Sequence, residues 1–142
     1  MPALLFGLLL VPLADQSIKL ILRRHLGSGS IPLGAAGTMR LVASQVWLAR
    51  FGKSLNPAAL WSIWGLSAAA LVSLTLVNPA FGVFAGLLLG GSSSHVLEST
   101  LRGGICDYVC LRFWPAFNTA DVAITVGAAG IVIHGFRILM MT

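Results

Sequence analysis

Residues 56–97 read NPAALWSIWGLSAAALVSLTLVNPAFGVFAGLLLGGSSSHVL, and this stretch decides the fold. It contains two apolar runs of about 20 residues, the length that crosses the hydrocarbon core of a bilayer. Each run begins with Asn-Pro, in which Asn caps a helix and proline occupies the first helical position. We therefore expect membrane helices over 58–77 and 79–97. Because almost no chain separates them, they must form a tight antiparallel hairpin.

The composition of the whole chain also indicates an integral membrane protein. Of its 142 residues, 57% are hydrophobic and 9% are charged, and the mean hydropathy is +0.92. Soluble domains carry about 25% charged residues. Further apolar runs at 3–22 and 121–140 bring the expected number of spans to four, in a single membrane domain covering 1–142. The net charge of +5 comes from scattered basic residues, so we expect membrane phospholipids and no nucleic acid as partners.

The segments outside the spans differ in character. The first apolar run has no positive charge before it and is too long for the core of a cleaved signal peptide, so we expect it to be retained. Residues 25–55 are rich in Gly, Ser and Pro and then alternate partly between polar and apolar over 40–51. We predict an all-α membrane protein of four transmembrane helices, with a small surface β-subdomain over 25–55 between helices 1 and 2. Residues 99–117 are predicted to be a loop.

Glycines follow one stripe of the third predicted span. Gly82, Gly86 and Gly90 are spaced by four residues, which lets a neighbouring backbone approach closely. At the same spacing the stripe continues to Ser94 and Glu98, so the packed face ends in a polar one.

The chain has only four carboxylates, and a charge at bilayer depth costs about 2.5 to 3.5 kcal/mol even on the most lenient scale. They are Asp15, Glu98, Asp107 and Asp121. With four spans, the ends of the first and third helices and the start of the fourth emerge on the same side of the membrane. We therefore expect all of the acids to gather at one face.

Two of these acids have helical partners, and the other two do not. Lys19 follows Asp15, and Arg102 follows Glu98, at the spacing of a favourable ion pair, which predicts structural supports. Asp107 lies in an apolar stretch that favours its protonated form, whereas Asp121 follows Asn118 at the start of a helix. Two carboxylates that share one proton activate a water and polarise a carbonyl, which is the chemistry of aspartic proteases.

The residues offer weaker support for two other functions, zinc binding and proton-coupled transport. Cys106, Cys110 and His95 would need a fourth ligand to hold zinc, so we expect no metal and no cofactor, and ordinary apolar thiols. A proton-coupled carrier could use the acids as relays, but the chain lacks the internal repeat that is typical of carriers.

Three stretches resemble the bacterial lipoprotein signal peptidase family, also called signal peptidase II. They are GGSSSHVLE at 90–98, GICDY at 104–108 and WPAFNTADVAI at 114–124. The corresponding family patterns are Gly-Asn-x-x-Asp-Arg, Val-Val-Asp-Phe and Phe-Asn-x-Ala-Asp-x-x-Ile, of which the last is intact here. Asp15 and Lys19 match an Asp and a Lys of the family's first span, so the similarity covers nearly the whole chain.

The resemblance implies a surface β-cradle, cytoplasmic termini and an active site at the outer leaflet of the bacterial cytoplasmic (inner) membrane. It implies an intramembrane aspartyl peptidase that cleaves the signal peptide from diacylglyceryl-modified prolipoproteins without a metal. By motif, the catalytic pair would be Asp107 and Asp121. Asn118 and Asp15 would support it, with Lys19 as the partner of Asp15. We expect a monomer.

The chain also departs from the family pattern. His95 stands where the family has Asn, and Glu98-Ser99 stands where it has Asp-Arg. The family's Asn-x-Gly-x-Ala-Phe element is missing, and the most similar segment is SQVWLA at 44–49. Such positions orient the catalytic pair or hold substrate in the family, so we count His95 and Glu98 as supporting or substrate-binding. We predict a divergent relative, either a peptidase with altered substrate preference or an inactive protein that binds lipoprotein, lipid or a peptidase inhibitor. Basic residues concentrate on the side of the acids, which opposes the family orientation.

Overall fold

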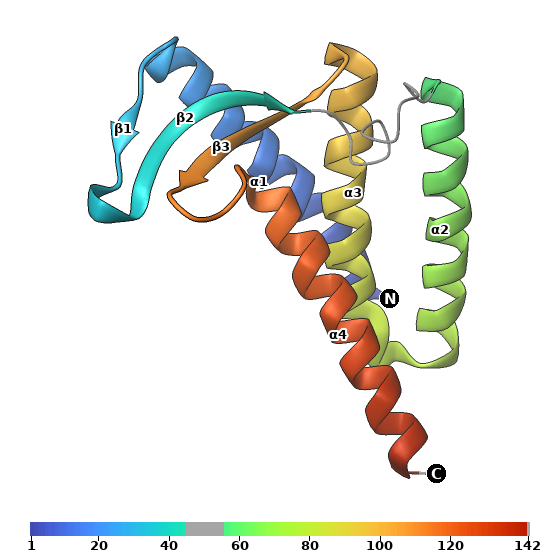
Figure 1. Cartoon of the computed structure of the whole chain (residues 1–142). Helices are drawn as coiled ribbons and strands as arrows, with labels where there is room; N and C mark the ends of the chain where they lie inside the picture. The colour runs from blue at the N-terminus through green and yellow to red at the C-terminus, as the bar shows by residue number, and fades with distance from the viewer. Residues whose placement is uncertain (45–55, 142) are drawn as a thin grey trace.

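The computed structural model describes residues 1–44 and 56–141, and four long helices dominate it (Figure 1). They are α1 (Pro2–Leu26), α2 (Pro57–Val77), α3 (Gly82–Arg102) and α4 (Thr119–Met141). Each belongs to a segment long and apolar enough to cross a membrane. The prediction of a multi-pass helical membrane protein is therefore confirmed.

The two Asn-Pro pairs begin helices as the sequence predicts. The side chain of Asn56 accepts a hydrogen bond from the backbone N–H of Ala58 at 2.8 Å, at the start of α2. Asn78 does the same for the N–H of Ala80 at 3.0 Å, opening a short 3₁₀ turn over Pro79–Phe81 that leads into α3. These caps satisfy backbone donors that would otherwise lack partners.

Helix α3 is the centre of the bundle, and α1, α2 and α4 all pack against it. Its glycine stripe faces α1: a Cβ atom added at Gly86 would lie 2.6 Å from the carbonyl oxygen of Leu4. A Cβ added at Gly90 would collide with the carbonyl oxygen of Gly7. The predicted close approach of two backbones is therefore confirmed. It places the polar end of the α3 stripe directly against α1.

A three-stranded antiparallel sheet lies at the end of the bundle where α1 and α3 end and α4 begins (Figure 1). Its strands are β1 (Ile31–Pro32), β2 (Gly37–Ser44) and β3 (Ile105–Leu111), in the spatial order β1-β2-β3. The predicted loop over 99–117 is wrong, because it contains β3. The sheet is thus not built from the α1–α2 connection alone. Of the predicted strand region 40–51, residues 45–51 lie outside the described residues.

The error over 99–117 has a physical reason. Strand β3 exists because it pairs with β2, with Asp107 opposite Val42 and Cys110 opposite Thr38. This pairing joins segments far apart in the sequence, so no local period reveals it. Its consequence is functional, because the strand fixes the position of Asp107.

We predict that Gly86→Ala destabilises the protein by about 1 to 3 kcal/mol, because the added methyl group overpacks the α1–α3 contact. The matched control is Gly65→Ala in α2, where an added Cβ meets no atom of the described residues within 4 Å. That change is expected to be neutral or stabilising by up to about 1 kcal/mol. Thermal unfolding in detergent measures both. Equal midpoints for the two variants would contradict the close-packing account.

Candidate active site

Two carboxylates from different elements meet at one asparagine. Asp107 lies on β3, Asp121 lies in the first turn of α4, and Asn118 immediately precedes that helix. The side-chain amide of Asn118 donates to Asp107 Oδ1 at 2.6 Å, and its backbone N–H donates to Asp121 Oδ2 at 2.9 Å. The two predicted catalytic residues are thus brought together, and Asn118 is fully buried between them.

The local sequence explains how Asp121 is held. The N–H of Asp121 donates to Asn118 Oδ1 at 3.0 Å, which reciprocates the bond from Asn118 N to the Asp121 carboxylate. This is a capping box, in which the residue before the helix and the third helical residue satisfy each other's backbone N–H groups. A negative charge at this position also lies near the positive end of the helix dipole. The NTAD sequence at 118–121 therefore positions Asp121 through bonds within four residues.

Asp107 has a different environment. Its side chain lies in the sheet, and the residue is only 6% exposed. Burial raises the pKa of Asp107 above its ordinary value of 3.8, and the negative charge of Asp121 acts in the same direction. Hydrogen bonds to its charged form, including the one from Asn118, oppose this rise. The two acids therefore occupy unlike sites. Asp107 is a buried residue of a strand, whereas Asp121 is at the start of a helix and its side chain is 39% exposed.

His95 completes the group from α3. Its Nε2 atom lies 3.2 Å from Asn118 Oδ1 and 3.6 Å from Asp121 Oδ1. Since the Asn118 amide nitrogen is directed at Asp107, its Oδ1 faces His95 as an acceptor, so Nε2 must be the donor. The residue that departs from the family's Asn thus contacts both the asparagine and one of the acids.

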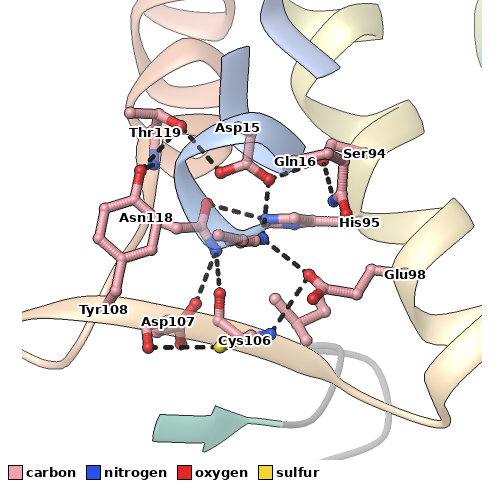
Figure 2. A network of polar contacts seen from close by, with 12 residues as sticks. Asp15, Gln16, Ser94, His95, Glu98, Cys106, Asp107, Tyr108, Asn118 and Thr119 are labelled. Atoms are coloured by element: carbon pink, nitrogen blue, oxygen red, sulfur yellow. Dashed lines mark hydrogen bonds and ion pairs between the residues drawn. The ribbon is translucent and has the colours of Figure 1, made fainter. Parts of the chain in front are cut away.

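A buried charge network adjoins this group, and Figure 2 shows two of its members, Asp15 and Glu98, near Asn118 and His95. Lys19 Nζ is 2.7 Å from both Asp15 Oδ2 and Glu98 Oε2, and all three side chains are at most 1% exposed. Arg23 and Arg102 also contact Glu98, at 2.7 and 3.2 Å. The predicted pairs Asp15–Lys19 and Glu98–Arg102 are both confirmed. The structure adds that Lys19 joins them into one network.

The network reaches both elements that carry the acid pair. On the α4 side, the Thr119 hydroxyl donates to Asp15 Oδ1 at 2.8 Å, and the Tyr108 hydroxyl donates to Thr119 Oγ1 at 3.0 Å. On the β3 side, the N–H of Cys106 donates to Glu98 Oε2 at 3.3 Å. The residues directly beside Asp107 and ahead of Asp121 are therefore tied to the same buried charges.

Several members of the site were not predicted from the sequence. Ser94 donates to Asp15 Oδ2 at 2.7 Å and accepts from Gln16 at 3.0 Å, and Arg23 contacts Glu98. A signal for Ser94 was present, since the α3 stripe that carries the glycines ends in Ser94 and Glu98 and faces α1. The Arg23 contact had no such signal, because Arg23 and Glu98 are 75 residues apart in the sequence, whereas the i,i+4 spacing of Glu98 and Arg102 predicted theirs.

In the described part of the chain, no three His, Cys, Asp or Glu side chains are placed to hold a metal ion. Cys106 and Cys110 are free thiols. The polar groups that meet at the acid pair are two carboxylates, an amide and an imidazole.

We predict that Lys19→Met destabilises the protein by about 3 to 5 kcal/mol, because it leaves two buried carboxylates without their shared cation. Arg102→Gln is the comparison, since the Arg102 side chain is 47% exposed and an exposed pair contributes at most about 1 kcal/mol. Unfolding in detergent with increasing denaturant gives both values. A similar decrease in the free energy of unfolding for the two variants would show that Lys19 is not the central cation of the network.

Comparisons with known proteins give the family of this chain. The family model described as signal peptidase (SPase) II matches residues 7–137. A protein named lipoprotein signal peptidase from Vibrio vulnificus (strain CMCP6) is 30% identical, over 91% of this chain and 85% of that protein. One of the same name from Cupriavidus taiwanensis is 32% identical, over 91% of this chain and 80% of that protein.

Solved structures agree at the level of the fold. Two structures of bacterial membrane enzymes superpose with TM-scores of 0.79 at 20% and 19% identity. The matches cover 94% and 96% of this chain, and 92% and 89% of the solved chains. With the family model spanning nearly every described element, the chain belongs to the signal peptidase II family.

Proposed function

We propose that this protein is an aspartic peptidase that removes the signal peptide from lipid-modified prolipoproteins, with Asp107 and Asp121 as its catalytic residues. The observation that carries this proposal is that Asn118 bonds to both carboxylates, at 2.6 and 2.9 Å. Family membership supports a peptidase and the substrate class, and it favours an enzyme over a protein that only binds lipoprotein, lipid or an inhibitor.

The unlike environments of the acids suggest their roles. Asp107, with its raised pKa, holds the shared proton and transfers it to the scissile carbonyl oxygen during the attack of water. Asp121 acts as the general base and takes a proton from a water, whose oxygen then bonds to the carbonyl carbon. As the C–N bond breaks, the proton on Asp121 passes to the leaving nitrogen, and Asp107 recovers its own proton from the collapsing intermediate. No covalent bond between enzyme and substrate forms.

The remaining residues would position this pair. Asn118 holds both carboxylates, and His95 donates toward Asn118 and Asp121. Asp15, Lys19 and Glu98 hold the start of α4 and the start of β3 through Thr119 and Cys106. Since all of these groups come from one chain, we propose that the monomer is sufficient for activity.

The location of the site suits a lipid-anchored substrate. The acid pair belongs to β3 and to the first turn of α4, and Figure 1 shows the sheet at the end of the bundle where α3 ends and α4 begins. We place this end of the bundle at the level of the membrane surface. A peptide bond close to a lipid-bearing residue would be presented at this depth. We propose that this surface faces outward from the bacterial cytoplasmic membrane. The basic residues on that side would then contact lipid headgroups.

We predict that Asp107→Asn and Asp121→Asn each lower cleavage by roughly a thousandfold or more, because each removes one proton carrier. The substrate is a diacylglyceryl-modified precursor, and cleavage is followed by gel shift with purified protein. Cys110→Ala on the same strand is the control and should cleave at the wild-type rate.

The amounts of each variant in membranes must also be compared, because loss of protein would mimic loss of activity. Cleavage by either Asp variant at the wild-type rate would end the aspartic mechanism. If wild type, control and both variants all fail to cleave any lipidated precursor, the result favours the alternative, an inactive protein that binds lipoprotein, lipid or an inhibitor.

Asp107→Asn is also expected to change how stability depends on pH. The pKa of Asp107 is raised in the folded protein, so the unfolded chain releases this proton at a lower pH than the folded protein does. Wild type therefore loses stability as the pH rises from about 3.8, the ordinary value, to the raised pKa, and the variant does not. The variant should therefore unfold at a higher temperature than wild type at pH 7. This difference should shrink toward zero below about pH 3.8, the ordinary value for Asp. A variant that is less stable than wild type at neutral pH would contradict the raised pKa.

A further inference from the structure

A separate cavity of about 320 Å³ lies on the other side of β3 from the acid pair. Arg23 at the end of α1 and Arg102 at the end of α3 line it, with Glu98 and Cys106 between them. Successive residues of a strand point to opposite faces, so Cys106 faces this cavity while Asp107 faces Asn118. The cavity is therefore distinct from the proposed catalytic site, although the two share a strand.

The accessible surface of this cavity is positive. Glu98 is only 1% exposed on its side chain and already contacts Lys19, whereas the Arg23 and Arg102 side chains are 28% and 47% exposed. The network contains three cations and two carboxylates, so it carries one excess positive charge although each cation contacts a carboxylate. That excess lies on the two guanidinium groups, since they are the exposed members.

Both guanidinium groups have donors to spare. A guanidinium carries five N–H donors, and each of these arginines uses one nitrogen atom on Glu98. The remaining edges suit the oxygens of a phosphate, which guanidinium groups bind in a bidentate manner. Glu98 therefore fixes the directions of both arginines without neutralising the surface that they present.

The surroundings identify a lipid as the source of that phosphate. The cavity lies where α1 and α3 end, at Leu26 and Arg102, so it stands at the level of the headgroups. Its other walls are apolar, with Leu41, Ala43 and Ile105 of the sheet. A free phosphate would gain nothing from these walls, whereas the glycerol and upper acyl carbons of a phospholipid would cover them.

We propose that Arg23 and Arg102 form a binding site for the phosphate of an anionic phospholipid headgroup. Glu98 also accepts the N–H of Cys106, the residue before Asp107, so an occupied site restrains the strand that carries one member of the acid pair. The lipid would thereby raise the rate of peptide cleavage. This second part rests on the proposed function; the binding site does not.

Binding is tested by native mass spectrometry of the detergent-purified protein with phosphatidylglycerol, phosphatidylcholine or inorganic phosphate. We expect Arg23→Gln/Arg102→Gln to bind phosphatidylglycerol roughly tenfold or more weakly than wild type. The matched control is Arg24→Gln/Arg112→Gln, which removes the same charge from exposed positions at the same end of the molecule. It should stay within about twofold of wild type.

Three results would overturn the site. Equal binding of phosphatidylglycerol and phosphatidylcholine by wild type would show no headgroup selection. Equal losses in the two double variants would show general charge attraction. Competition by inorganic phosphate as effective as that by the lipid would show an ordinary anion site. If the double variant does not fold, Arg102→Gln alone takes its place, with a smaller loss of roughly fivefold expected.

The effect on activity is tested by cleavage in phosphatidylcholine bilayers with and without phosphatidylglycerol. Wild type and Arg24→Gln/Arg112→Gln should cleave faster with the anionic lipid, and the ratio should fall to about one in Arg23→Gln/Arg102→Gln. A wild-type ratio of one would overturn the coupling to β3. Lipid binding without any cleavage in either bilayer would instead overturn the proposed function and leave the binding site standing.

Discussion

The structure depends on one buried cation. Lys19 has no exposed surface and lies 2.7 Å from two carboxylates, Asp15 on its own helix and Glu98 on α3. An unpaired ammonium group at this depth would cost several kcal/mol, so the helices that supply its partners must stay together. The same carboxylates accept hydrogen bonds from Thr119 and from the N–H of Cys106, and thereby hold α4 and β3. The two ionic contacts of Lys19 thus connect every element that carries the site.

Close backbone packing makes that contact possible. Glycines at 7, 86 and 90 let α1 and α3 approach until side chains of ordinary size would collide, which brings Lys19 within reach of Glu98. Large apolar side chains are exposed along all four helices, which are long and apolar enough to cross a membrane. The protein therefore concentrates its polar groups at one end of the bundle. There they position two acids in unlike environments, the arrangement that an aspartic mechanism requires.

Much of this arrangement could be predicted from the residues. The Asn-Pro caps, the glycine stripe and the Asp15–Lys19 spacing act within a few residues, so local patterns revealed them. The intact block at 117–124 placed Asn118 and Asp121 together. Strand β3, the shared use of Lys19 and the contact of Arg23 with Glu98 could not be predicted, because each joins segments more than 60 residues apart. Such contacts arise from the way the helices and the sheet pack together, so the periodicity of nearby residues does not reveal them.

The central claim is that Asp107 and Asp121 share one proton. The chain contains only three aspartates, so protein labelled with ¹³C at aspartate gives three carboxyl signals in nuclear magnetic resonance, and Asp107→Asn and Asp121→Asn assign two of them. At the pH of fastest cleavage we predict one protonated and one ionised carboxyl in the pair, with each titration altered when the other residue is replaced. Two fully ionised carboxyls at that pH, or two titrations that ignore each other, would contradict the account.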